Sequence, residues 1–465
     1  MAIWVKTVRL KGVCARALAV VALGAFVADA RAESLHSALT RAYAANPVLG
    51  AQRANVRATD ENVARAKAGY RPRITATADA GTRYIESSRP GVPTFSQTTT
   101  PYGFGIGIEQ TLFDGFRTDN SVRQAEAGVL NARESLRNQE QTTLFEAATA
   151  YMNVLRDTAV LNLERNNVEV IEEQLRQVQA RRDVGEITRT DVFQAQARLA
   201  LSQSRASLAE SNLRTSMGRY RQVIGVEPRA LAPGRPVDHL VPRSVEQALR
   251  LSQEEHPAAK AALHAVDVAE LQVRITEGEL YPTLTLAGDV AQRFDVQAPG
   301  DEQFSASVVA RLTVPIYEGG AVYARTRQAK ETAGQRRLEA DSTLDQVRSA
   351  VVSAWGQYEA SKAQIAAAEA QVQASETALE GVRNEARVGQ RTTLDVLNAQ
   401  QELLNARVNL VTAQRDRVVA SYAVVQAIGR LNYRALGLDT PEYTPVTHLR
   451  QVKDLWRGTL TPDGR

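Results

Sequence analysis

The sequence repeats itself, and this duplication limits the folds that the chain can adopt. Residues 184–196 read VGEITRTDVFQAQ and residues 388–400 read VGQRTTLDVLNAQ, an offset of 204 positions. Residues 70–81 (YRPRITATADAG) correspond to residues 280–291 (LYPTLTLAGDVA) at an offset of 210. A chain with this pattern is expected to fold as two structurally similar halves.

Each half has the same predicted order of elements. We expect a first repeat over residues 33–225 and a second over 244–433, each beginning with a helical run. The following elements are a β-hairpin (71–113 or 281–317), a very long helix (117–182 or 321–387) and a shorter helix (190–224 or 392–428). Four prolines mark a linker over 226–243, and residues 434–465 form a tail.

The first 32 residues have the features of a secretory signal peptide. A basic segment precedes the apolar run 17–28, and Ala30-Arg31-Ala32 resembles a cleavage site. Removing this leader also removes Cys14, the only cysteine, and leaves equal numbers of acidic and basic residues. The mature chain therefore lacks the strong basic footprint of a nucleic-acid-binding protein. It also has no disulfide.

Four segments alternate apolar and polar residues with the two-residue period of a β-strand. In residues 104–113, Phe104, Ile106 and Ile108 share one face, and 73–80, 283–290 and 305–316 alternate likewise. Aromatic residues bracket these segments, as in the girdles of membrane strands. Because no other apolar run of the mature chain reaches helix-spanning length, any membrane crossing would use strands. A soluble sandwich with aromatic strand ends is the less favoured interpretation.

Four strands cannot close a barrel in lipid, because two edges would leave their amide groups unpaired. The chain is therefore expected to share its strands with further copies. A trimer would supply twelve strands, although this reasoning leaves a tetramer open. The long helices, each about 100 Å in length, also need neighbours along their whole length. They would continue the barrel as a hollow cylinder.

Together, these motifs resemble the TolC family of outer-membrane factors. The resemblance rests on the two VG-x-x-x-x-T/L-DV segments, on LFDGFR and PIYEGG after the second strand of each half, and on YRPR and LYPT before the first. It implies an α+β membrane protein, a trimeric TolC-like α/β-barrel. In that fold a shared 12-stranded transmembrane β-barrel continues into a periplasmic 12-helix α-barrel tunnel.

The resemblance also implies a function and partners. The protein would be the outer-membrane exit duct of a tripartite efflux pump or type I secretion system in a Gram-negative bacterium. It would conduct small molecules or unfolded protein passively, bound to a periplasmic adaptor (a membrane fusion protein) and an inner-membrane ABC, RND or MFS transporter. The tail segment 445–458 is similar to tails of the type I secretion branch. No cofactor or metal is implied.

The repeated segments are first expected to be turns. Gly185 and Gly389 follow the long helices, where a left-handed residue often ends a helix. Thr188 and Thr392, each followed three positions later by an aspartate, resemble capping boxes that open the next helices.

The same turns are the candidate gate. By resemblance, Thr190, Asp191, Arg391 and Asp395 occupy gate positions, and the nearby Arg189 and Arg387 are further candidates for pairing with the aspartates. Where some relatives carry a second acid, this chain has Asn398. Small and polar residues beside the tips could seat the adaptor, or could equally be ordinary helix packing: Ala195, Gln196, Ala399 and Gln400.

Two other functions are weighed against the duct. An enzyme is disfavoured because the five histidines are scattered and the sequence holds no catalytic motif. A periplasmic coiled-coil structural or adaptor protein without a pore would explain the long helices but not the four alternating segments.

Overall fold

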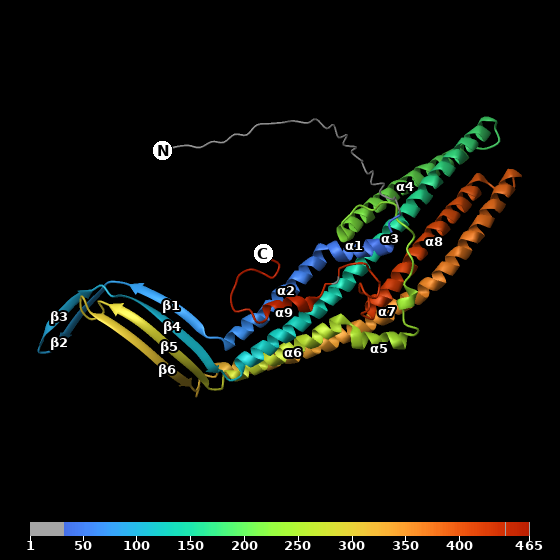
Figure 1. Cartoon of the computed structure of the whole chain (residues 1–465). Coiled ribbons are helices and arrows are strands. Elements are labelled where there is room, and N and C mark those ends of the chain that lie inside the picture. The colour runs from blue at the N-terminus through green and yellow to red at the C-terminus, as the bar shows by residue number, and fades with distance from the viewer. Residues whose placement is uncertain (1–31, 442, 465) are drawn as a thin grey trace, which may run out of the picture.

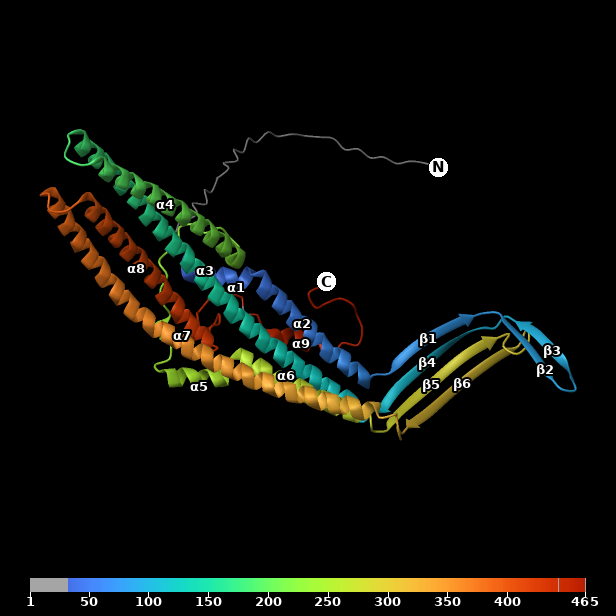
Figure 2. The ribbon, with the colours of Figure 1, turned by 180° about the vertical axis from the view of Figure 1, so that it is seen from behind.

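The computed structural model describes residues 32–441 and 443–464, so nearly all of the predicted leader lies outside the described residues. The chain is elongated, with its helices at one end and its strands at the other (Figure 1; Figure 2 shows the reverse side). None of the helices in the described residues is long and apolar enough to cross a membrane.

Two helical hairpins form the end remote from the strands. The first pairs α3 (Arg117–Asp183) with α4 (Arg189–Ile224), and the second pairs α7 (Ala321–Arg387) with α8 (Thr393–Ala427). Helices α3 and α7 each contain 67 residues, which corresponds to about 100 Å. In both views the two hairpin tips point away from the sheet (Figures 1 and 2).

The helical run that opens each half is broken in two. The first half has α1 (Leu35–Ala45) and α2 (Pro47–Lys67), and the second has α5 (Val245–Glu255) and α6 (Pro257–Gly278). Each break falls where a residue before proline is extended, at Asn46 and His256. Between the breaks and the sheet, α2 packs on α3, α3 on α6, and α6 on α7, so α2 and α7 lie at the two sides of this layer. Two short 3₁₀ helices, η1 (Ala68–Tyr70) and η2 (Asp238–Leu240), lie in the connections.

The main sheet contains four antiparallel strands in the order β1-β4-β5-β6. Their bounds are β1 Arg73–Ala80, β4 Tyr102–Phe113, β5 Thr283–Phe294 and β6 Glu302–Thr313. One row across the sheet joins Ile74, Ile108, Gly288 and Val308. The adjacent row, on the other face, joins Thr75, Gly107, Asp289 and Ser307. One face is therefore apolar and the other polar, and β1 and β6 are free edges.

The apolar face is uncovered. Phe104 is 61% exposed and Val308 is 78% exposed, although both side chains are large and hydrophobic. The rings of Tyr102 and Phe294 stack at 4.8 Å at the end of the sheet remote from the helices. Tyr281, at the helical end, is half exposed. Such a contiguous apolar band between aromatic ends is typical of a lipid-facing surface.

The first hairpin contains two strands that the sequence interpretation treated as a loop. Strands β2 (Arg83–Arg89) and β3 (Val92–Thr99) form a separate two-stranded sheet. Pro90-Gly91, with Gly91 at φ +80°, makes the turn between them. This extension accounts for the six-residue difference in offset between the halves, because the second half has only a short loop over residues 295–301.

The hydrophobic core lies where the two hairpins meet the opening helix. Tyr151 of α3 is fully buried there, and its hydroxyl lies 2.7 Å from the carbonyl oxygen of Glu33 and 2.6 Å from that of Ala232. The tail continues along α2: helix α9 (Pro445–Val452) packs on it, and His448 Nδ1 lies 3.1 Å from the buried carboxylate of Asp60.

Candidate functional site: the tips of the two helical hairpins

The two long helices end in the same backbone motif. Gly185 and Gly389 adopt left-handed conformations, with φ of +81° and +80°. In the first tip, the N–H of Glu186 donates to the carbonyl of Arg181 and that of Gly185 to the carbonyl of Arg182. The second tip contains the same two hydrogen bonds, in the turn that precedes α8. This Schellman motif satisfies the last carbonyls of the helix and reverses the chain.

A capping box then opens each second helix. Thr188 Oγ1 accepts from the N–H of Asp191, and Asp191 Oδ2 accepts from the N–H of Thr188 at 3.0 Å. Thr392 and Asp395 do the same. The bond from the Thr392 N–H, together with that from its hydroxyl, lowers the pKa of Asp395. In both aspartates Oδ1 accepts no hydrogen bond within the described part of the chain.

Each tip also has an ion pair that joins the end of its long helix to the turn, and these two pairs have opposite polarity. In the first tip the helix carries the cation, and Arg181 Nε lies 3.0 Å from Glu186. In the second tip the helix carries the anion, and Arg391 Nε lies 2.8 Å from Glu385. The bond to Glu385 raises the pKa of Arg391. Arg391 therefore pairs within its own tip, and neither Arg189 nor Arg387 forms an ion pair with either aspartate in the described residues.

A cleft of about 830 Å³ separates the two tips, and both contribute to its walls. Six of the residues singled out in the sequence line it: Thr188, Asp191, Arg387, Gly389, Arg391 and Thr392. Thr190, Gly185 and Asp395 do not. The lining also contains charged residues that the sequence interpretation did not single out, among them Glu169, Glu173, Arg181 and Arg383. The cleft is thus a mixed-charge surface between two hydrogen-bonded turns.

One hydrogen bond connects the two hairpins near the tips. Arg198 of α4 donates from Nη2 to Asn398 Oδ1 of α8, at 2.7 Å. The sequence interpretation noted Asn398 only as a missing acid and did not consider Arg198. Helical spacing offered a signal, because Asn398 lies three residues after Asp395 and Arg198 seven after Asp191, on the same faces as the aspartates.

The four residues expected to seat an adaptor have different surroundings. Ala195 is fully buried against Val178 and Val192 between α3 and α4. It therefore offers no surface, and the expectation that it seats a partner is wrong. Gln196 is exposed, Ala399 is half-buried, and Gln400 accepts a hydrogen bond from Arg383 of α7 at 2.9 Å.

Comparison with solved structures defines the class of protein to which this fold belongs. The chain superposes on the Campylobacter jejuni CmeC outer membrane channel with a TM-score of 0.77 at 15% identity, covering 90% of this chain and 89% of that one. A crystal structure of a Pseudomonas aeruginosa membrane protein gives a TM-score of 0.76 at 18% identity, covering 85% and 90%. The fold is thus that of TolC-like outer-membrane channels, as the resemblance implied.

The family follows from the sequence. The model of the family described as "Outer membrane efflux protein" matches residues 38–226 and 248–430. The outer membrane efflux protein BepC of Brucella suis is 43% identical over 438 residues, 94% of each chain. This chain therefore belongs to the outer membrane efflux protein family. It is an outer-membrane protein of Gram-negative bacteria and an exit duct of the efflux and type I secretion class, so these expectations are confirmed. The alternative of an adaptor without a pore is not supported.

Proposed function

We propose that the chain works as a homotrimer that pools its strands and helices into one continuous duct. The sheet carries this proposal. It has an apolar face left bare and free edges at β1 and β6. In a membrane each free edge would leave a row of amide groups without partners. Joining β6 of one copy to β1 of the next removes every edge, and three copies give the twelve strands of a barrel with a lumen.

The tips would form the gate at the far end of this duct. Asp191 and Asp395 each keep one carboxylate oxygen free of hydrogen bonds within the described chain, and Arg391 lies in the same cleft as Asp191. In a trimer six tips would meet around the axis. Links between neighbouring tips, added to the Arg198–Asn398 bond within each chain, would hold the passage closed.

The same cleft is the proposed docking site for a periplasmic adaptor. It is lined by both cationic and anionic side chains and lies between two capped turns. Such a surface suits a polar helical hairpin better than an apolar peptide. The adaptor would connect the duct to an inner-membrane ABC, RND or MFS transporter. The duct itself would conduct its cargo passively and without catalysis.

Channel recording tests this proposal. The purified protein should run as a heat-sensitive oligomer and insert into planar bilayers as a channel of low conductance. Exchanging Arg391→Ser or Asp191→Ala should raise that conductance. If the oligomer forms a channel whose conductance neither exchange changes, the gate assignment fails and only the duct remains. If no channel forms, the duct proposal fails.

A deletion strain would identify the cargo class. Increased susceptibility to small amphiphilic drugs indicates efflux, whereas loss of a secreted protein from the medium indicates type I secretion. The alkaline protease secretion protein AprF of Pseudomonas aeruginosa, 27% identical over 68% of this chain and 67% of its own length, supports including the second outcome.

A further inference from the structure

The C-terminal tail runs along α2 toward the sheet. Helix α9 packs on α2, and in both views the tail then loops out on the side of the sheet before it ends (Figures 1 and 2). Successive tail residues contact successively later residues of the segment that leads into β1. The pairs are Tyr443 with Arg53, His448 with Asp60, Asp454 with Lys67, and Leu455 with Arg71. The tail therefore reaches the junction between the helices and the sheet.

The tail reverses its direction at this junction. The guanidinium of Arg71, two residues before β1, lies 4.7 Å from the centre of the Trp456 ring. Gly458 then adopts a left-handed φ of +114°, and Asp463 lies 4.0 Å from Nε of Arg57, further back along α2. The reversal places Trp456 at the point of the tail that lies nearest to β1 along this path.

The apolar side chains of this turn are left uncovered by the rest of the described chain. Trp456 is 72% exposed, Leu460 is 74% exposed, and Leu455 is half exposed. Tyr70, which precedes Arg71, is half exposed as well. Tryptophan and tyrosine are enriched where lipid meets water, because their rings are apolar with one polar atom. The aromatic end of the sheet thus continues into the tail.

The turn also carries an excess of positive charge. Residues 450–457 contain three cations, Arg450, Lys453 and Arg457, and one acid, Asp454. Lys67 Nζ lies 2.7 Å from the Asp454 carboxylate and neutralises it. The hydrogen bond from Lys67 lowers the pKa of Asp454, and the charge of Lys453 lowers it further. An apolar turn with cations beside it matches a phospholipid surface, whose phosphates attract lysine and arginine.

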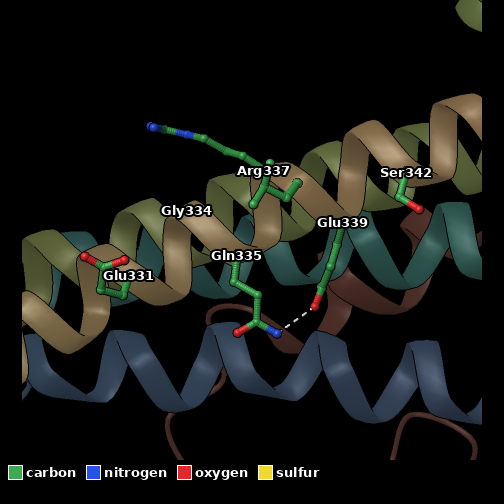
Figure 3. A pocket seen from close by; sticks show the side chains of 7 residues that line it. Glu331, Gly334, Gln335, Arg337, Glu339 and Ser342 are labelled. Atoms are coloured by element: carbon green, nitrogen blue, oxygen red, sulfur yellow. Dashed lines mark hydrogen bonds between the residues drawn. The ribbon is translucent and has the colours of Figure 1, made fainter.

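An exposed apolar site on α7 shows that exposure alone does not give this match. The shallow depression around Leu338 is lined by two carboxylates, Glu331 and Glu339, and by one cation, Arg337 (Figure 3). Glu339 accepts a hydrogen bond from Gln335, drawn there as a dashed line. Phosphates would be repelled from such a site, whereas they are attracted to the tail turn.

We propose that the tail turn (residues 453–460) docks on phospholipids of the periplasmic leaflet of the outer membrane. The Trp456 ring lies at the level of the head groups, Leu455 and Leu460 contact the acyl chains, and Lys453 and Arg457 bind lipid phosphates. Lipid is the occupant because the turn lies where the bare apolar face of the sheet ends, so a membrane around the sheet also meets the turn. This docking depends on the outer-membrane location and not on the number of copies in the duct.

Tryptophan fluorescence tests the docking, because the mature chain has two tryptophans in different surroundings. Trp355 lies about 50 Å along α7 from Ala321, the residue at the sheet end of that helix. The full mature chain carrying Trp355→Phe is placed in nanodiscs that contain phosphatidylglycerol, with bromine on the upper part of the acyl chains. Emission from Trp456 should fall about twofold relative to unbrominated lipid, because bromine quenches a ring at head-group level. Trp456→Phe, which keeps Trp355, is the matched control and should not be quenched.

Charge reversal tests the contact with phosphate. In the Trp355→Phe background, Lys453→Glu together with Arg457→Glu should abolish the quenching of Trp456. Arg229→Glu together with Arg235→Glu makes the same change of charge in the linker, which pairs with Glu33 before α1 and so lies beyond the opposite end of α2. This control should keep the quenching.

The outcomes distinguish the docking from the proposed duct. If Trp456 is quenched no more than Trp355, the turn does not touch the membrane and the proposal is wrong; the turn is then free for a protein partner. If the quenching is as strong after the reversal at 453 and 457 as after the linker control, the assignment of these cations to lipid phosphate is wrong. Quenching as expected in a protein that forms no heat-sensitive oligomer would support the docking while the shared duct fails.

Discussion

The hydrogen bond between Arg198 and Asn398 gives the sharpest prediction for the gate. It joins α4 to α8 at 2.7 Å, and replacing Arg198 by alanine removes it without touching the capping boxes. A hydrogen bond of this kind, partly exposed, contributes about 1 kcal/mol. In a trimer whose subunits open together, three such bonds break at once, so the closed state loses about 3 kcal/mol of stabilisation. Because 1.4 kcal/mol is tenfold in an equilibrium constant, the open-to-closed ratio should rise about 100-fold.

Single-channel recording in planar bilayers measures this ratio directly. Arg198→Ala should increase the open probability, and Asn398→Asp should decrease it, because a carboxylate strengthens the bond to the guanidinium. Arg214→Ala is the matched control, since Arg214 also lies on α4 but pairs with Glu210 of the same helix. An open probability that Arg198→Ala leaves equal to that of Arg214→Ala would refute the reasoning.

Three further predictions concern single helices. Burial lowers the pKa of His256, whose neutral Nδ1 accepts the hydrogen bond that caps α6. The stabilisation from this cap should be fully present above about pH 6.5 and should decrease as the pH falls. His256→Asn introduces the residue type found at the equivalent Asn46 and should abolish this decrease in thermal melts. Thr188→Ala should destabilise the first turn of α4 by about 1 kcal/mol and accelerate its amide exchange about fivefold. His448→Ala leaves the buried Asp60 carboxylate without its hydrogen-bond donor, which costs about 1–3 kcal/mol, and should expose the tail to proteolysis.

Each of these predictions has a matched control. His264→Ala removes a histidine whose contact, to Asp267, lies at the surface of α6, so it should alter neither the pH dependence nor the tail. Thr215→Ala removes a hydroxyl within α4 that bonds to the preceding turn, and it should leave the exchange of the first turn unchanged. The argument for His256 is contradicted if the stability of His256→Asn keeps the same pH dependence. The argument for Thr188 is contradicted if Thr188→Ala leaves the amide exchange of the first turn of α4 unchanged. The argument for His448 is contradicted if the tail of His448→Ala stays resistant to protease.

Local patterns in the sequence were sufficient for much of the fold. Strand alternation over 104–113 depends on a two-residue period, and the turns at Gly185 and Gly389 depend on residues within the turn. The capping boxes likewise need only a threonine and an aspartate three positions apart. Such features are determined by nearby residues, so the sequence reveals them without knowledge of tertiary packing.

Contacts between distant segments were not predictable in the same way. Arg198 and Asn398 are 200 positions apart, and His448 and Asp60 are 388 apart. Only the packing of α4 on α8 and of α9 on α2 brings them together. Helix geometry also determines that Arg391 pairs with Glu385. In the sequence, Asp395, four residues away, was an equally reasonable partner. Strands β2 and β3 were missed although Pro90-Gly91 is a turn signal.

The number of copies in one channel tests the shared duct most directly. Native mass spectrometry of the protein released from membranes, combined with conductance of the same preparation, gives that number. We predict three chains for every conducting unit, with no conductance from the single chain. A folded monomer that carries a complete channel by itself would contradict the account, because its β1 and β6 edges would then be closed without a partner.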